Sequence, residues 1–225
     1  MAILEGKNLT IRNKANNLIM NDFSFSIEPG EIWIVMGPNG IGKSSLWEAL
    51  IGILPIASGQ LFLNARDITH IMPAKRVRLG MKYIAQNNAL IDDITVEENL
   101  LIVAESLVKI SERKRAIEKA VTTFSLEHLL TRRADALSGG QRRRVELAKI
   151  TIGPSDIVLL DEPFAAVDEE YTQKITDTFS KLKKEGKSLL INDHNAAAMR
   201  SIANYCIHLG HAREKGKTYI EKIEN

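Results

Sequence analysis

The residue types that can hold a polyphosphate lie in one stretch of the chain, Gly37-Pro38-Asn39-Gly40-Ile41-Gly42-Lys43-Ser44. Its glycines let the backbone curl so that successive N–H groups face phosphate oxygens. The ammonium of Lys43 can reach the β- and γ-phosphates, and the hydroxyl of Ser44 is placed to bind Mg²⁺. The stretch predicts a nucleotide-binding loop, and the alternative is a chance glycine-rich turn.

Two other expected strands end at residues that could act on the same ligand. The apolar residues 157–160 lead to Asp161 and Glu162, and residues 188–192 lead to His194. Asp161 could hold Mg²⁺, and Glu162 could polarise an attacking water. A helix cap is the alternative for the acidic pair, and a structural role is the alternative for the histidine.

These residues need neighbouring strands that point the same way. Residues 31–36 are expected as a buried strand that runs into the loop, and residues 45–51 as the helix that leaves it and stops at Gly52. The helix begins at Ser45, and its N-terminus adds partial positive charge at the phosphates. The alternation of strands and helices predicts an α/β fold with a parallel, helix-covered core, whose strands share one ligand-binding edge at their carboxyl ends.

Two smaller regions are expected beside this core. Short strands at residues 3–5, 9–12, 23–27 and 58–64 favour an antiparallel sheet. Thr95-Val96-Glu97-Glu98 is a capping box that opens a helical region, and residues 111–124 are expected as its second helix. We therefore expect one domain over residues 1–225, with the core and antiparallel sheet in 1–85 and 151–225 and a helical subdomain in 87–150.

Composition limits the function classes. The net charge of +2 is close to balanced, so no large field gathers nucleic acid, and the single cysteine, Cys206, fits a reducing compartment. The first five residues lack the basic and apolar regions of a signal peptide, and no apolar run approaches the length that spans a bilayer. Any role at a membrane is expected to come through a partner.

The motif Leu137-Ser138-Gly139-Gly140-Gln141 resembles the signature of the ATP-binding-cassette (ABC) ATPases, and the resemblance covers essentially the whole chain. It implies a P-loop NTPase fold with a RecA-like parallel core, an antiparallel β subdomain and a helical signature subdomain. The matching site residues are those of the nucleotide loop (Gly37 to Ser44, with Ser45), the Q-loop glutamine Gln86, the Walker B pair Asp161 and Glu162, the D-loop Asp168 and the switch histidine His194. In the family, Gln86 corresponds to a residue that touches Mg²⁺ and water and links to the transmembrane partner.

The resemblance implies an ATP-hydrolysing subunit that drives a membrane transporter, with ATP and Mg²⁺ as cofactors. Ser138, Gly139 and Gly140 open a helix and can present N–H groups and a hydroxyl to an anion. In the family this second anion site faces the ATP of another subunit, which implies a head-to-tail homodimer or heterodimer. Residues 87–91 are the expected docking lip for transmembrane subunits, and the expected location is cytoplasmic, peripheral on the inner face of the membrane.

A narrower resemblance is to the lipopolysaccharide-export and branched-chain amino acid group of these ATPases. It rests on Arg142-Arg143-Arg144-Val145-Glu146, on residues 161–168 and on Asp193-His194-Asn195. We interpret the arginine run as a solvated or partner-facing surface, and nucleic acid is not an expected partner. One departure is the adenine region, where the family usually has an aromatic residue near positions 11 to 13 and this chain has Ile11, Arg12 and Asn13.

Three other functions compete with the transporter. A DNA-repair or chromosome-organising ATPase of the same superfamily would have a long coiled coil between the phosphate loop and the signature, whereas residues 45–136 hold only a compact helical region. A soluble translation factor would have two cassettes in one chain, and this chain has one. A non-enzymatic binding module is disfavoured because Lys43, Asp161, Glu162 and His194 are all present.

Overall fold

The computed structural model describes residues 1–85, 90–210 and 218–223. Within them the strands form two sheets, one of four strands in the order β2-β1-β4-β5 and one of six in the order β10-β9-β3-β8-β7-β6. The strands of the first sheet are β1 (Leu4–Arg12), β2 (Leu18–Ile27), β4 (Ser58–Leu63) and β5 (Arg66–Asp67). Those of the second are β3 (Ile32–Met36), β6 (Met81–Ile84), β7 (Ile157–Asp161), β8 (Ser188–Asn192), β9 (Tyr205–His208) and β10 (Tyr219–Lys222).

The two sheets differ in strand direction, as the sequence predicts. Every pairing in the smaller sheet is antiparallel, whereas β6, β7, β8, β3 and β9 are parallel and only β10 runs against its neighbour. The carboxyl ends of β3, β7 and β8 therefore share one edge of the core sheet, which is where the predicted site residues begin.

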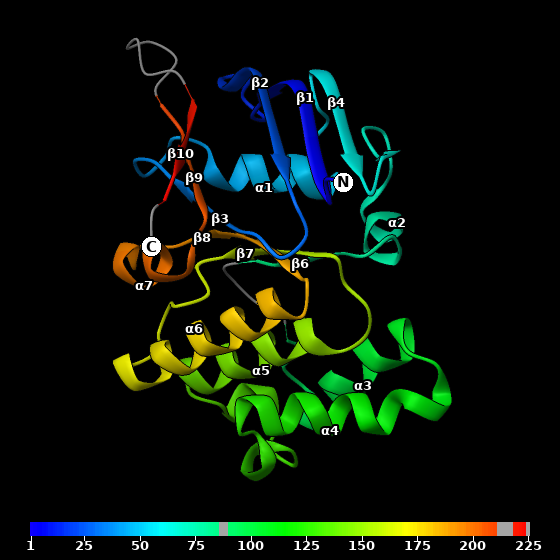
Figure 1. Cartoon of the computed structure of the whole chain (residues 1–225). Coiled ribbons are helices and arrows are strands. Elements are labelled where there is room, and N and C mark those ends of the chain that lie inside the picture. The colour runs from blue at the N-terminus through cyan, green and yellow to red at the C-terminus, as the bar shows by residue number, and fades with distance from the viewer. Residues whose placement is uncertain (86–89, 211–217, 224–225) are drawn as a thin grey trace.

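The helices cover both faces of the core sheet. They are α1 (Lys43–Ile51), α2 (Pro73–Arg78), α3 (Val96–Leu107), α4 (Arg113–Phe124), α5 (Gly139–Thr151), α6 (Glu169–Lys184) and α7 (Ala196–Ile202). Helix α1 lies between the two sheets, and α5 and α6 lie on the opposite face of the core with α3 and α4 beyond them (Figure 1).

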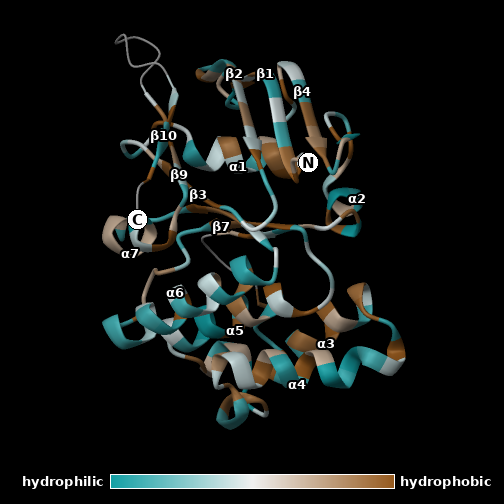
Figure 2. Cartoon of the chain, viewed as in Figure 1, coloured by the Kyte–Doolittle hydropathy of each residue, from teal (hydrophilic) through white to brown (hydrophobic). Residues whose placement is uncertain are grey.

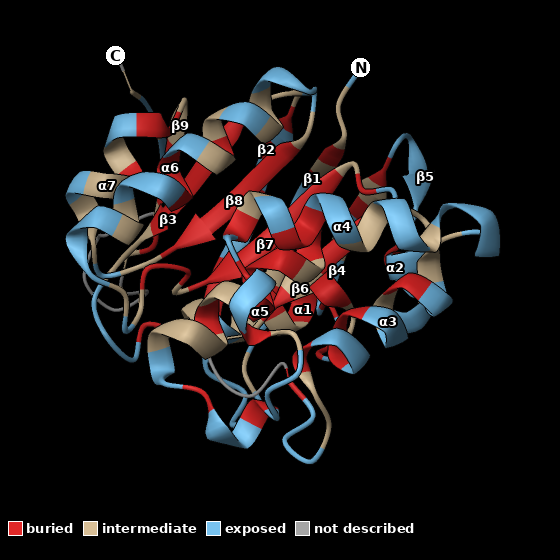
Figure 3. Ribbon diagram, turned by 90° about the horizontal axis from the view of Figure 1, so that it is seen from below, coloured by how far each residue is buried: buried red, intermediate tan, exposed pale blue. Residues whose placement is uncertain are grey.

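Alternating side chains of the core strands pack into two apolar clusters. Leu159 and Leu190 face the cluster that contains α1 and the antiparallel sheet, whereas Leu160 and Ile191 face the cluster that contains α3 to α6. Every residue of β7 and β8 is buried, as expected of strands that are covered on both faces (Figure 3). Hydrophilic residues gather on the outer sides of α4 and α6, so the apolar faces of these helices point inward (Figure 2).

The predicted capping box is present at α3, where the Thr95 side chain accepts from the Glu98 N–H and the Glu98 carboxylate accepts from the Thr95 N–H. The second predicted helix begins as a single 3-10 turn, Ile110–Glu112, before α4. No helix among the described residues has the length and apolar character needed to cross a bilayer.

One strand prediction is wrong. The expected strands at residues 3–5 and 9–12 are a single strand, β1, that continues through Asn8 in a left-handed conformation with φ of 49°. The pairing with β2 shifts register there, so the polar interruption in the sequence is an irregularity inside one strand and does not mark a turn.

Candidate nucleotide site

The phosphate loop leaves β3 and enters α1 through glycines that the backbone requires. Gly42 has φ of 109°, and a Cβ at that position would lie 2.3 Å from Ile19 Cδ1. The Lys43 ammonium donates to the carbonyl oxygens of Gly37 at 2.7 Å and Pro38 at 3.3 Å. Lysine therefore lies folded over the loop, where an incoming phosphate can replace these carbonyls as its partner.

The N-terminus of α1 is suited to an anion. In the described structure no side chain caps this helix and its first turn contains no acidic residue. Its first N–H groups are thus available to phosphate oxygens, and Ser44 beside them is exposed. Ser45 is half-buried on the same turn.

Asp161 ends β7 as a buried carboxyl beside its neighbour on β8. Asn192 lies opposite it in the parallel register and donates its side-chain N–H to Asp161 Oδ1 at 2.7 Å. Burial raises the pKa of Asp161 above its ordinary value and the charge of Glu162 adds to this, whereas the hydrogen bond from Asn192 opposes it. A cation beside this carboxyl would stabilise its ionised form.

Glu162 and His194 meet at the same edge, as predicted. His194 Nε2 lies 3.2 Å from Glu162 Oε1, and the histidine side chain is 63% exposed whereas the glutamate side chain is 16% exposed. Glu162 has φ of 53°, a conformation that residues other than glycine rarely adopt. Its N–H donates to the Asn192 carbonyl at 2.7 Å, so the strained turn is anchored to the end of β8 and aims the carboxylate at the histidine.

Asp193 is a further residue of this site, and the sequence analysis assigns it no role. Its carboxylate accepts from the Phe164 N–H at 2.8 Å and from the Asn195 N–H at 2.8 Å. It thereby joins the loop after Glu162 to the loop that carries His194. The acidic residue directly before the histidine is the signal that could have identified it.

The signature motif forms the N-terminus of α5. The Ser138 hydroxyl accepts from the Gln141 N–H at 3.3 Å, and the Gln141 side chain accepts from the Ser138 N–H at 3.1 Å. Ser138 and Gly139 are exposed. Gly140 packs closely on the loop between β7 and α6, where a Cβ would lie 3.0 Å from the Ala166 carbonyl oxygen. The predicted D-loop residue Asp168 caps α6 by accepting from the Tyr171 N–H at 2.7 Å.

The interpretation of the arginine run as a solvated or partner-facing surface is wrong. Arg143 is only 4% exposed and donates to the backbone oxygens of Asp161, Ala85 and Pro163 and to the Glu146 carboxylate. Arg142 forms an ion pair with Asp92 at 2.7 Å, and Arg144 donates to the Phe124 carbonyl and lies over the Tyr171 ring. Successive helical residues point about 100° apart, so each arginine reaches a different neighbour inside the chain.

The residues present fit a magnesium ion. The Ser44 hydroxyl and the Asp161 carboxylate are hard oxygen donors of the kind that Mg²⁺ prefers. The buried side chain of Trp47 leaves its indole N–H without a partner in the described structure, an arrangement that costs about 1–3 kcal/mol. Burial is the largest of the causes that raise the pKa of Asp161, and the nearby Trp47 side chain is among the groups that oppose it. The expected third group, Gln86, lies outside the described residues.

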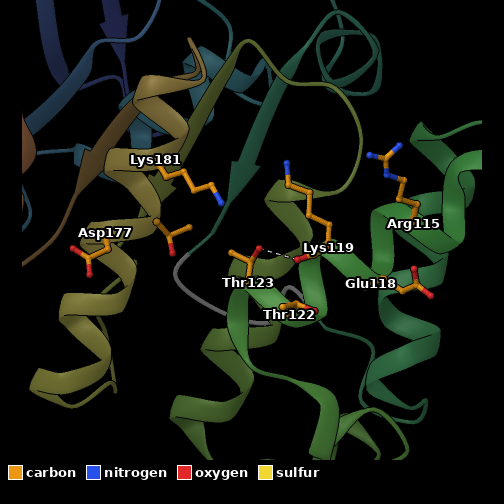
Figure 4. A pocket seen from close by; sticks show the side chains of 8 residues that line it. Arg115, Glu118, Lys119, Thr122, Thr123, Asp177 and Lys181 are labelled. Atoms are coloured by element: carbon orange, nitrogen blue, oxygen red, sulfur yellow. Dashed lines mark hydrogen bonds between the residues drawn. The ribbon is translucent and has the colours of Figure 1, made fainter.

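Two other features of the molecule lie apart from this site. An open hollow of about 660 Å³ between α4 and α6 contains none of the predicted site residues (Figure 4). It is lined by polar and charged side chains, namely Arg115, Glu118, Lys119, Thr122, Thr123, Asp177, Thr178 and Lys181.

A group of possible metal ligands, Cys206, His208 and Glu221, lies on β9 and β10. Glu221 is already held by Arg200 at 3.1 Å and by His208 at 2.6 Å, and burial raises the pKa of Cys206 to about 11. The thiol is therefore protonated at neutral pH and its neighbours are paired with one another, so these residues do not favour a metal.

The fold of this chain is similar to that of solved ATP-binding cassettes of ABC transporters. The chain matches a nucleotide-free ATP-binding cassette from an ABC transporter with a TM-score of 0.85 and 25% identity, over 100% of this chain and 92% of that one. It also matches a dimeric bacterial ABC transporter cassette with a TM-score of 0.86 and 22% identity, over 99% of each chain. A third match is cbiO1 of Clostridium perfringens, part of the ABC transporter complex cbiONQ, with a TM-score of 0.84 and 22% identity, over 99% of this chain and 88% of that one.

Sequence comparisons agree with the geometry. The lipopolysaccharide export system ATP-binding protein LptB of Escherichia coli is 32% identical over 94% of this chain and 89% of the relative. The "Probable branched-chain amino acid transport ATP-binding protein LivF" of Archaeoglobus fulgidus is 34% identical over 83% of this chain and 79% of the relative. The family model of the ABC transporters matches residues 20–165, from within β2 to the turn after Glu162. With its phosphate loop, its signature helix and its acidic strand end in the family's order, the chain belongs to the ABC transporters, as an ATP-binding cassette subunit that hydrolyses ATP.

Proposed function

We propose that this cassette hydrolyses Mg²⁺-ATP at the edge formed by β3, β7 and β8, in a head-to-tail dimer that drives transmembrane subunits. Lys43 and the free N–H groups of α1 bind the phosphates. Glu162 orients and activates the attacking water, and His194 positions Glu162 and contacts the γ-phosphate. This assignment is supported by the 3.2 Å contact of His194 with Glu162. It is also supported by the neighbouring Asp161, whose pKa stays raised by burial despite its hydrogen bond from Asn192.

Ser44, Asp161 and Gln86 are the residues that would hold Mg²⁺. When bound, the ion would neutralise charge on the phosphate oxygens. The chain's own residues do the remaining work, since Asn192 holds the Asp161 carboxylate in place and Asp193 fixes the two loops on which Glu162 and His194 sit.

The proposed dimer is supported by the exposure of Ser138 and Gly139 at the N-terminus of α5. The N-terminus of this helix is a second anion site in addition to the phosphate loop of the same chain, and its hydroxyl keeps a proton to donate after accepting from Gln141. A second copy placed head to tail would present its ATP to this helix. The dimeric state of a similar cassette agrees with this arrangement.

The proposed docking region for transmembrane subunits is the expected lip at residues 87–91, of which 87–89 lie outside the described residues, together with exposed apolar side chains on or near α2 and α3. Its exposed side chains are Met72, Val77, Ile91, Leu101 and Ile102. Val77 of α2 and Val103 of α3 line one cavity of about 170 Å³ with Ile150 of α5, so the three helices are neighbours there. We propose that residues 87–150 form the helical subdomain and that residues 1–85 and 151–225 form the core and the antiparallel sheet. The boundary between the two parts lies beside this docking region. Docking there would hold the cassette on the inner face of the membrane.

The test of the catalytic and dimer assignments is the variant Glu162→Gln. It keeps the shape of the side chain but loses the base, so ATP should stay bound and the dimer should stay closed. We expect a dimer with Mg²⁺-ATP and a monomer with ADP when the variant is sized by light scattering at about tens of micromolar.

A second substitution in this background tests the signature helix. Ser138→Arg places a bulky side chain at the exposed helix N-terminus and should abolish the dimer while leaving ATP bound. Ser201→Arg, at an exposed serine of α7, is the matched control and should leave the dimer intact. A Glu162→Gln protein that stays monomeric with Mg²⁺-ATP at these concentrations would contradict the head-to-tail site.

A further inference from the structure

Trp47 is an unusual side chain for the interior of α1. It is completely buried, and its indole N–H is the buried side-chain polar group that meets no hydrogen-bond acceptor in the described part of the chain. The protein's other tryptophan, Trp33, is also buried, but its indole N–H donates to Glu31 at 2.8 Å. A phenylalanine could fill the space at position 47 without burying a polar group, so packing alone does not account for the tryptophan.

The position of Trp47 in the helix directs it toward the catalytic edge. It follows Ser44 by three residues and Lys43 by four, so the three side chains lie on one face of α1. That helix packs against β7, the strand that ends in Asp161. Burial is the main cause that raises the pKa of the Asp161 carboxyl, and a smaller opposing effect comes from Trp47, whose side chain therefore lies near that carboxyl.

The Asp161 carboxylate has an oxygen that can accept a hydrogen bond from the Trp47 indole N–H. Asn192 already donates to Oδ1 at 2.7 Å, which leaves Oδ2 as the oxygen for the indole or for a cation. A carboxylate that binds a metal through one lone pair of an oxygen still has further lone pairs to share. Such outer donors fix the orientation of a metal-binding carboxylate.

We propose that Trp47 is a positioning residue for Asp161: its indole N–H forms a hydrogen bond with the Asp161 carboxylate when Mg²⁺ and nucleotide are bound, and this bond sets the affinity of the site for the metal. The inference rests on the proposed function, in which Asp161 holds Mg²⁺. The N–H without an acceptor is then a donor whose bond forms in the loaded state.

The first experiment reads the indole groups directly by nuclear magnetic resonance on protein with isotope-labelled tryptophan. The two indole signals are assigned with the variant Trp33→Phe. Addition of ADP with a chelator, followed by excess Mg²⁺, should move the Trp47 indole proton downfield only in the second step, while the Trp33 signal stays in place. A Trp47 signal that is indifferent to Mg²⁺ while Mg²⁺ strengthens ADP binding would overturn the proposal.

The second experiment compares Trp47→Phe with the matched control Trp33→Phe. The affinity of each ADP-loaded protein for Mg²⁺ is measured by titration, together with ADP affinity in the presence of a chelator. Loss of an outer donor typically costs 10–100-fold in metal affinity, so we expect at least about a tenfold loss for Trp47→Phe and about none for Trp33→Phe. ADP affinity without the metal should remain within about twofold of the parent in both variants.

The outcomes separate the two proposals. Equal Mg²⁺ affinity in the two variants would overturn the role of Trp47 and leave the proposed function intact. A parent protein whose ADP affinity is independent of Mg²⁺ would instead overturn the assignment of the metal site, and with it the role of Trp47.

Discussion

At the scale of single residues, the end of β1 and the turn after it hold Ile11, Arg12 and Asn13, where the family resemblance implies an aromatic residue that stacks on adenine. Ile11 is completely buried, and the Arg12 guanidinium donates to the Asn16 carbonyl at 2.9 Å. The Asn13 side chain accepts from the N–H groups of Ala15 and Asn17 and so closes the turn. None of these side chains offers an aromatic face on which a base could stack.

We therefore expect weak discrimination between nucleotide bases. An aromatic ring stacked on a base is worth about 1–3 kcal/mol in nucleic-acid sites, and this turn lacks one. GTP should displace a labelled ATP analogue within about tenfold of the concentration of ATP at equal Mg²⁺, a gap of about 1.4 kcal/mol. Arg12→Ala should weaken both nucleotides alike. A much larger preference for ATP would show that another group reaches adenine.

Single residues also show where sequence reasoning succeeds and where it ends. Lys43, Glu162 and His194 fall on strand and helix ends that the pattern predicts, because a motif and an apolar run specify both the residue and its element. The roles of Asp193, Arg143 and Trp47 depend on which atoms face them across the fold. Those neighbours are distant in sequence, so neither periodicity nor a motif could indicate them.

At the scale of elements, α5 is held to the core sheet at both ends. Near its N-terminus, Arg143 donates to the Asp161 carbonyl at 2.6 Å and to the Ala85 carbonyl at 3.2 Å. At its C-terminus, Lys82 Nζ from β6 donates to the carbonyls of Ile150 at 2.8 Å and Ile152 at 2.6 Å. The signature helix is consequently fixed to β6 and to the end of β7, where Asp161 lies.

This arrangement predicts a large difference between two adjacent arginines. Arg143→Met removes a buried charge and its hydrogen bonds, which typically costs about 3–5 kcal/mol, whereas Arg142→Met removes an ion pair with a half-exposed carboxylate, worth about 0–1 kcal/mol. Urea unfolding of the two variants and the parent measures both effects. Equal loss of stability in the two variants would show that the contacts of Arg143 are not what fixes the helix.

The elements themselves were largely predictable. Apolar runs over β3, β7 and β8 and the capping box of α3 locate those elements within a residue or two, because local pattern and tertiary burial agree there. The error at β1 arose because Asn8 tolerates a left-handed conformation within a strand, and the sequence alone presents the same polar break as a turn.

At the scale of the whole molecule, the buried Lys82 makes stability depend on pH. Burial, with the charge of Lys187 adding to it, lowers the pKa of Lys82 from 10.5 to about 7. Between about pH 7 and pH 10.5 the unfolded chain therefore retains a proton that the folded chain has released, and the free energy of unfolding rises with pH by up to about 1.4 kcal/mol per unit.

The variant Lys82→Met should lose this component. Its free energy of unfolding should rise less steeply than that of the parent above about pH 7, so the stability of the parent relative to the variant increases toward pH 10. Lys75→Met, at an exposed lysine of α2, is the control and should follow the parent. Chemical unfolding at a series of pH values gives the slope of the free energy of unfolding against pH for each of the three proteins. Equal slopes for all three would contradict the lowered pKa of Lys82.

In a head-to-tail dimer, the contact of Arg143 with the end of β7 would connect two nucleotide sites. Each chain would lend its signature helix to one ATP and its acidic strand end to the other, so a single guanidinium would join two different reaction centres. A shift of the strand end during turnover at one centre would be transmitted to the helix that grips the second nucleotide. Hydrolysis at one ATP would then affect hydrolysis at the other through the contact of Arg143 with the end of β7. The order of the two events would depend on this contact within each chain.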